Sequence, residues 1–296
     1  YSDRFEAVHL QTGGTGLVVL ADTTGNGLAT FQVDSNGTMV EQNQVASQQA
    51  AFTGQISALS VVTQGSNSFV LAASASNHSI TAYAVSSNGT LSPASTLGAQ
   101  QFLLIATPQD MATVSVQGQS YIVLASAGTG SLTVLTLDSA GVLSPVDQVA
   151  DSLNTRFQGA QVLESFTHQG NAYVIAAGQD SGLTLFRFSD DGQLVHLDTI
   201  ADQLNTPINS ITDIYVDIIG GDVQLFTVSG SEAGIGHFTL SLSTTSTAQA
   251  PVLSAQATGQ PLHGGPGADL LPHGARRAQA SCGTRGDRCE VSAGRA

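Results

Sequence analysis

The feature that most constrains the fold of this chain is an alternating hexapeptide that recurs at a nearly constant spacing. It first appears as Leu-Ala-Thr-Phe-Gln-Val at positions 28–33, and later copies begin at Ile80, Leu132, Leu183 and Ile235. These starting points are separated by 52, 52, 51 and 52 residues. Such a period over most of a chain indicates tandem copies of one supersecondary unit.

Each copy contains four strand-like segments in a fixed order. In the second copy the first strand covers 56–62, and a continuously apolar second strand follows at 69–73. Continuous apolar character predicts burial on both faces of the second strand, whereas the alternating third strand predicts one buried and one wet face. A shorter, polar segment comes fourth, as expected for an outer strand.

The turn after the third strand has its own signature. Asp or Ser opens the turn with a side-chain acceptor, and a glycine closes it, which predicts a positive φ in a bulged hairpin loop. The four copies lie at 34–37, 86–89, 138–141 and 189–192. The fifth repeat has Ser241–Ser246 in place of this turn. This predicts that the last unit lies at an edge or is a decayed copy of the repeat.

Four antiparallel strands in about 50 residues, repeated without helices, match the blade of a β-propeller. We therefore predict an all-β fold over residues 1–258, with about five four-stranded blades. The blades are expected near 5–48, 55–99, 109–150, 159–202 and 210–257. Five blades can close a ring. Because the chain opens at Tyr1 without Met, a fragment of a larger ring or a processed product is the alternative.

The charge distribution argues against two classes of partner. Residues 1–271 contain three Arg and no Lys against 20 acidic residues, so the balance is 3 − 20 = −17. Such a field repels phosphate backbones and anionic lipid headgroups, so no nucleic-acid or membrane-surface partner is expected. No stretch approaches the roughly 18 apolar residues that are needed to span a bilayer.

The segment at 173–194 reads Tyr-Val-Ile-Ala-Ala-Gly-Gln-Asp-Ser-Gly-Leu-Thr-Leu-Phe-Arg-Phe-Ser-Asp-Asp-Gly-Gln-Leu. It resembles the blades of lactonase-type and YVTN-type propellers, and especially propeller regions of bacterial secreted proteins that end in RTX (hemolysin-type) repeats. The resemblance covers the repeated body of the chain. It implies the architecture, and it constrains the activity only weakly.

Residues 264–272, Gly-Gly-Pro-Gly-Ala-Asp-Leu-Leu-Pro, match the RTX nonapeptide at each of its defined positions. Glycines at Gly264, Gly265 and Gly267 allow a tight turn whose carbonyls point at an ion, and Asp269 supplies a hard anionic oxygen. By resemblance, this segment (259–272) implies calcium binding in an extracellular protein that leaves the cell by type I secretion.

One nonapeptide supplies only half of the ligands of a β-roll site, in which each ion lies between successive turns. The continuation, residues 273–296, keeps no Gly-Gly-x-Gly-x-Asp pattern and holds both cysteines, Cys282 and Cys289. We predict an irregular tail there, either a divergent native segment or a stretch read in a shifted frame.

No catalytic set emerges from the sequence. The seven histidines fall at different repeat positions without pairing, so a zinc site is not expected. A Gly-x-Ser-x-Gly nucleophile motif is missing as well. The chain is therefore expected to be a non-enzyme, and no catalytic residue is assigned.

A candidate ligand face lies where the second-to-third-strand hairpins meet the crossovers between blades. It gathers Asp22, Asp151, Asn154, Asp180, Asp202 and Asn205. Convergent carboxylates and amides at a propeller mouth could hold a cation or a sugar-like ligand. The alternative is that these residues cap turns.

Three functional hypotheses remain. The first is a non-enzymatic, secreted calcium-binding protein whose propeller is a scaffold or binds a glycan or a protein. The second is a lactonase-like hydrolase that acts at the propeller mouth. The third is a surface adhesin.

Overall fold

The computed structural model describes residues 5–12, 15–22, 27–45, 54–203, 206–232, 234–242 and 253–254. Within these ranges the chain forms five four-stranded antiparallel sheets and one short 3-10 helix, η1 (Ala99–Gln101). Each sheet uses four strands that are consecutive in sequence, so each is one blade. In the part of the chain that the structure describes, no helix is long and apolar enough to cross a membrane.

The strands of the first three blades are as follows. Blade 1 contains β1 (Phe5–Thr12), β2 (Thr15–Asp22), β3 (Gly27–Val33) and β4 (Met39–Val45). Blade 2 contains β5 (Ile56–Gln64), β6 (Asn67–Ser74), β7 (Ser79–Val85) and β8 (Leu91–Gly98). Blade 3 contains β9 (Pro108–Val116), β10 (Gln119–Ser126), β11 (Ser131–Leu137) and β12 (Leu143–Ala150).

The last two blades follow the same plan. Blade 4 contains β13 (Val162–His168), β14 (Asn171–Ala177), β15 (Gly182–Phe188) and β16 (Leu194–Ala201). Blade 5 contains β17 (Ile211–Ile219), β18 (Asp222–Ser229), β19 (Ile235–Leu240) and the two-residue β20 (Leu253–Ser254). The turn expected to be decayed, 241–246, extends beyond the described residues at 243.

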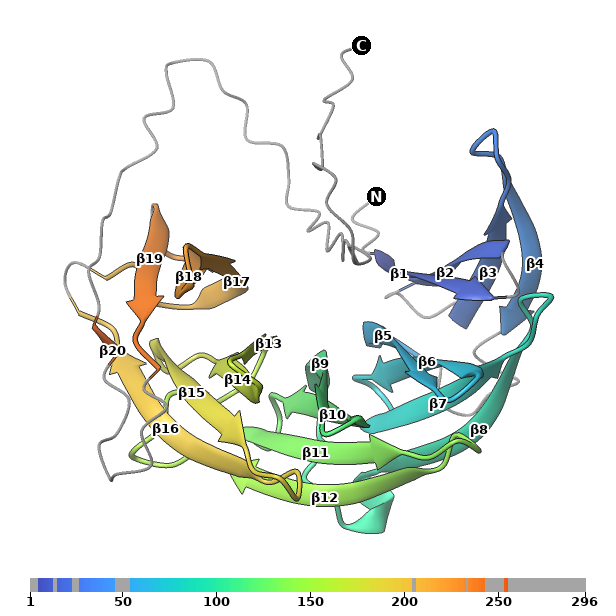
Figure 1. Ribbon diagram of the computed structural model, residues 1–296. Coiled ribbons are helices and arrows are strands. Elements are labelled where there is room, and N and C mark those ends of the chain that lie inside the picture. Colours follow the sequence, from blue (N-terminus) through green and yellow to red (C-terminus); the bar gives the residue numbers. More distant parts are fainter. Residues whose placement is uncertain are drawn as a thin grey trace.

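The blades stand side by side on an arc, with the first strand of each on the inner side and the fourth on the outer side (Figure 1). The first strands of consecutive blades contact one another. The prediction of an all-β propeller with five four-stranded blades is therefore confirmed. Each blade has a rear face toward the preceding blade and a forward face toward the following one.

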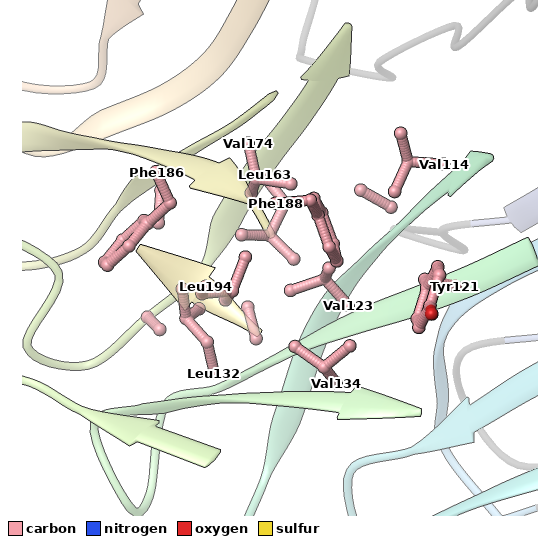
Figure 2. Packing of buried hydrophobic residues seen from close by; sticks show 14 of the residues in the cluster. Val114, Tyr121, Val123, Leu132, Val134, Leu163, Val174, Phe186, Phe188 and Leu194 are labelled. Atoms are coloured by element: carbon pink, nitrogen blue, oxygen red, sulfur yellow. The ribbon is translucent and has the colours of Figure 1, made fainter. Parts of the chain in front are cut away.

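Four apolar clusters fill the spaces between consecutive blades. At the junction of blades 3 and 4, Val123 and Val134 pack with Val174 and Phe186 (Figure 2). The neighbours of Val123 along β10 belong to the cluster on the other side, shared with blade 2. The predicted burial of the second strand on both faces is thus confirmed, and it explains why that segment is continuously apolar.

The turn between the third and fourth strands forms as predicted. In blade 1, the Asp34 carboxylate Oδ1 accepts hydrogen bonds from the N–H groups of Asn36, at 2.9 Å, and Thr38, at 2.7 Å. Gly37, Gly89, Gly141 and Gly192 have φ values of 81°, 82°, 84° and 85°. An L side chain at this φ costs roughly 1–2 kcal/mol, which accounts for the glycine.

A side-chain latch joins the outer strands of consecutive blades. The N–H of Leu91 donates to Asn43 Oδ1 at 3.2 Å, that of Leu143 to Ser95 Oγ at 3.2 Å, and that of Leu194 to Asp147 Oδ2 at 2.8 Å. Each acceptor lies beside an irregularity in the pairing of its third and fourth strands. A β-bulge re-aims side chains, and here it directs the acceptor toward the next blade.

Candidate functional site

The third crossover, residues 151–161, joins β12 to β13 and lies against the hairpin between β14 and β15. The N–H of Gln179 in this hairpin donates to the Gln158 carbonyl at 2.7 Å. The N–H of Gln161 donates to the Ala177 carbonyl at 3.1 Å. The two loops are therefore held together by backbone hydrogen bonds, and their side chains occupy one end of the blade 3–4 junction.

Asp151 organises the start of this crossover. Its Oδ1 accepts hydrogen bonds from Thr155 Oγ1 at 2.7 Å and from the Phe157 N–H at 3.1 Å. Phe157 is fully buried beneath the loop and packs edge-on against Phe186, with ring centroids 5.7 Å apart. The Asp151 carboxylate thus caps a turn, and the buried ring fixes the turn to the blade.

The guanidinium of Arg156 lies next to Asp180. It is the only guanidinium among the described residues of this loop. The backbone N–H of Arg156 donates to Thr184 Oγ1 at 2.8 Å, and its Nη1 donates to the Thr155 carbonyl at 2.9 Å. Its side chain lies over Gly182, where a Cβ atom would meet the Arg156 Cβ and Cγ atoms at 2.9 Å. The glycine leaves room for the arginine stem, and among the described residues the guanidinium has no hydrogen-bond partner other than the Thr155 carbonyl.

Asp180 is the group with the most unusual environment on this face. It lies in the β14–β15 hairpin and is partly buried, and its Oδ1 is buried without a hydrogen-bond partner among the described residues. Burial raises the pKa of the Asp180 carboxyl, and the charge of Asp151 raises it further. The backbone N–H groups of Asp180 and Gln158, and the Arg156 guanidinium, lower that pKa and offset part of the rise.

The fourth crossover repeats this arrangement with different chemistry. Asp202 Oδ1 accepts from Thr206 Oγ1 at 3.3 Å, as Asp151 does from Thr155. The acid of the facing hairpin, Glu232, accepts the Asn209 N–H at 2.9 Å through its Oε2. Pro207 stands where the third crossover has its arginine. Among the described residues, the third crossover therefore combines a carboxyl oxygen without a partner and a neighbouring cation, whereas the fourth does not.

Of the residues predicted for the ligand face, the structure brings Asp151 and Asp180 together. Asp202 lies one crossover further along the chain, and the exposed Asn154 offers its carbonyl to Thr199 Oγ1 at 2.9 Å. Asp22 ends β2, and its side chain lies outside the described part, as does all of Asn205. The predicted calcium residues Gly264, Gly265, Gly267 and Asp269 also lie outside the described residues, so their role stays a prediction.

Sequence reasoning missed Arg156, although one signal was present. It is one of only three arginines before residue 272, and it follows the repeated Asp-x-Leu-Asn-Thr segment directly. Two exposed apolar residues were also missed: Phe102 and Leu153 are 95% and 96% exposed, at corresponding places in successive crossovers. Among the described residues, three or more His, Cys, Asp or Glu side chains nowhere form a group that could hold a metal ion.

Comparison with known proteins supports the fold. No protein-family model and no curated protein matches the sequence. A structure of a protein from Lactobacillus plantarum matches with a TM-score of 0.57 and 19% identity over 81% of this chain and 67% of that chain. A protein from Bacteroides fragilis, provisionally named a 6-phosphogluconolactonase, matches with a TM-score of 0.58 and 16% identity over 86% of this chain and 71% of that one. At these identities the likeness concerns the fold alone.

Proposed function

We propose that this propeller binds a sugar lactone at the third crossover and hydrolyses it, with Asp180 as the residue that contacts the reacting water. One observation carries the proposal: the Asp180 Oδ1 atom is buried without a hydrogen-bond partner among the described residues, beside a second carboxylate and an arginine. An unsatisfied buried acceptor costs about 1–3 kcal/mol, so it calls for an explanation such as a ligand that donates to it. Carboxyl groups with raised pKa values cluster at functional sites.

The chemistry needs a base and a stabiliser of negative charge. Water attacks the lactone carbonyl while the Asp180 carboxylate takes a proton from that water, which leaves a tetrahedral oxyanion. The carbon–oxygen bond of the ring then breaks, and the departing oxygen takes up the proton to become a hydroxyl group. The Arg156 guanidinium supplies positive charge where the oxyanion develops, which is the effect of an oxyanion hole.

The charges of the site fit this ligand class better than an anionic one. Two carboxylates surround a single guanidinium in the third crossover, so the site as a whole is negative. A neutral lactone avoids repulsion from Asp151 and Asp180, and its hydroxyl groups can donate to their oxygens. The fold likeness to a protein provisionally named a 6-phosphogluconolactonase supports a lactone as the first compound to try.

Replacing Asp180 by asparagine is expected to lower kcat/KM for glucono-1,5-lactone by about 10²–10⁴-fold, the usual contribution of a general base. The pH profile is a second readout. Since the pKa of Asp180 is raised, the rate should rise with pH above the ordinary range of an aspartate. Asp151→Asn keeps an oxygen acceptor for the turn but removes the charge, so it should move this rise to lower pH.

Asp190→Asn is the matched control, because Asp190 is an exposed acid of blade 4 in the turn between β15 and β16, at the other end of the strands. It should leave the kinetics unchanged. The proposal fails if the wild-type chain neither hydrolyses nor binds the lactone, or if Asp180→Asn behaves like Asp190→Asn.

We infer a second role, calcium binding in the secreted protein, from the nonapeptide at 264–272. If it holds, calcium should raise the melting temperature of the wild-type chain, because a ligand that binds only the folded state stabilises it by mass action. Asp269→Ala should abolish this shift, since it removes the anionic ligand of the motif. Asp287→Ala, in the tail beyond the motif, should retain it. A melting temperature that ignores calcium would contradict this role.

A further inference from the structure

The two most exposed large apolar side chains among the described residues lie on loops of the candidate site and its neighbour. Leu153 is 96% exposed and Phe102 is 95% exposed, whereas no other large apolar side chain in the described part exceeds 59%. Leu153 belongs to the third crossover itself, between Asp151 and Arg156. Phe102 belongs to the second crossover, residues 99–107, which joins β8 to β9. Single exposed apolar residues are common, so the place of these two extremes matters more than their exposure.

The hairpin between β10 and β11, residues 127–130, joins the two crossovers. The N–H of Gly128 donates to the Ala106 carbonyl of the second crossover at 2.9 Å. On the other side, the N–H of Asp151, the first residue of the third crossover, donates to the Gly130 carbonyl at 2.8 Å. The two crossovers therefore flank this hairpin, at the end of the blades that carries the candidate site.

The β10–β11 hairpin differs in composition from the hairpins at the same place in other blades. Its residues are Ala-Gly-Thr-Gly, whereas the hairpins of blades 2, 4 and 5 include a histidine, an aspartate and a glutamate. Neither this hairpin nor the second crossover contains a charged residue, although the chain has a net charge of −14. Phe102, residues 127–130 and Leu153 thus make up an uncharged strip that begins in the third crossover.

The local backbone holds both exposed side chains in place. Leu153 lies in a turn that is closed by a hydrogen bond from the Thr155 N–H to the Ser152 carbonyl at 3.1 Å. Phe102 ends η1 with a φ of 61°, and its N–H donates to the Ala99 carbonyl at 3.1 Å. Glycine or asparagine is usual at such a left-handed end position, so a phenylalanine is unfavourable there. A bulky residue that is kept in this conformation points to a role for its ring.

Leu104 fixes the second crossover to blade 3. Its N–H donates to Gln148 Oε1 at 2.6 Å, and its carbonyl accepts a hydrogen bond from Thr129 Oγ1 at 3.0 Å. Gln148 lies on β12, three residues before Asp151. Phe102 therefore stands on a loop that is tied to the strand leading into the site. A surface that is ordered in advance loses less conformational freedom when a ligand binds to it.

We propose that the substrate is a lactone with an apolar chain, and that this chain binds along the β10–β11 hairpin between Leu153 and Phe102. The inference rests on the proposed function, because the lactone ring must bind beside Asp180 and Arg156. The chain adds affinity as its methylene groups leave water, and no charged side chain of the strip loses its hydration. An anionic membrane surface fits this strip less well, since it repels a chain with a net charge of −14.

The kinetic test compares two δ-lactones that differ in an alkyl chain on the ring. The wild-type kcat/KM should be at least about tenfold higher for δ-decalactone, which has a pentyl chain, than for δ-valerolactone, because each buried methylene contributes up to about fourfold in binding. Leu153→Ser and Phe102→Ser should each lower this ratio by about threefold or more, through a higher KM for δ-decalactone. Val142→Ser replaces an exposed apolar residue in the β11–β12 turn, at the other end of the blades, and should keep the wild-type ratio.

Direct binding separates the chain site from the proposed reaction. The δ-lactam 2-piperidone and its 6-pentyl derivative keep the ring carbonyl but resist hydrolysis, so calorimetry measures their binding even without turnover. The wild-type chain should bind the pentyl lactam at least about tenfold more tightly, and Leu153→Ser and Phe102→Ser should narrow the difference. Equal binding of the two lactams overturns the proposal whatever the rate of hydrolysis. A preference for the pentyl lactam in a chain that hydrolyses no lactone, or in which Asp180→Asn hydrolyses lactones normally, supports the chain site and contradicts the proposed reaction.

Two other occupants of the strip are outcomes of the same variants. Sedimentation velocity detects a second copy of the chain, and flotation with phosphatidylcholine vesicles detects a lipid surface. Association of either kind that Leu153→Ser and Phe102→Ser abolish, without a preference for the pentyl lactam, overturns the proposal. Circular dichroism of each variant verifies that the blades are folded.

Discussion

Phe186→Ala is expected to lower the free energy of unfolding by about 3–5 kcal/mol, the usual cost of truncating a fully buried phenylalanine. Its ring is 1% exposed and lies between blades 3 and 4 (Figure 2). It contacts the rings of Phe157 and His196. The alanine variant leaves a cavity that the neighbouring strands can fill only in part, because hydrogen bonds hold them in both blades.

Chemical denaturation measures this effect, and Phe102→Ala is the matched control because its side chain is 95% exposed. Surface substitutions away from special features usually change stability by less than about 0.5 kcal/mol. Since Phe157 covers Phe186 and belongs to the third crossover, the Phe186 variant should also reduce lactone hydrolysis. A loss of stability below about 1 kcal/mol would contradict the assignment of Phe186 to a closely packed junction.

Gly192→Ala should destabilise the fold by about 2–5 kcal/mol, which combines the cost of a positive φ with the cost of overpacking. A Cβ at this position would overlap the Tyr121 ring of the preceding blade. Gly37→Ala isolates the first contribution, because Gly37 occupies the same turn of blade 1 at a similar φ and has nothing within 4 Å of the added atom. It should cost only about 1–2 kcal/mol.

Thermal or denaturant unfolding of both variants separates the two contributions. Equal losses of stability for Gly37→Ala and Gly192→Ala would show that the turn of blade 4 does not press against the Tyr121 ring. Gly141 offers a repetition of the test, since a Cβ there would lie 2.5 Å from the Phe69 ring.

The architecture could be predicted because the period of the repeat and the patterns of its strands both indicate the same four-stranded blade. The continuous apolar run at 121–125 requires burial on both faces, and the turn glycines require a positive φ. These are properties of local segments, so a single copy shows them, and their recurrence along the chain makes the repeat plain.

The junctions could not be predicted in the same way. The latch acceptors Asn43, Ser95 and Asp147 differ in residue type, and a bulge directs each of them toward the next blade. Nothing in the sequence marks a bulge of this kind. The site was found in part, because an acidic residue in a hairpin is visible, but the contact with Arg156 depends on how the crossover folds over Gly182.

The latches have a consequence for how propellers of this kind can change in size. Blades 2 and 3 each present an acceptor on the forward side and a matching N–H on the rear side, at the same place in the repeat. A duplicated blade would therefore already contain the acceptor and the N–H that pair with its new neighbours. Interactions that reach only the adjacent unit also make stability an approximate sum over blades and junctions. Gain or loss of a whole blade thus preserves every remaining contact, whereas a shift of a few residues within one blade would break the connections on both of its sides.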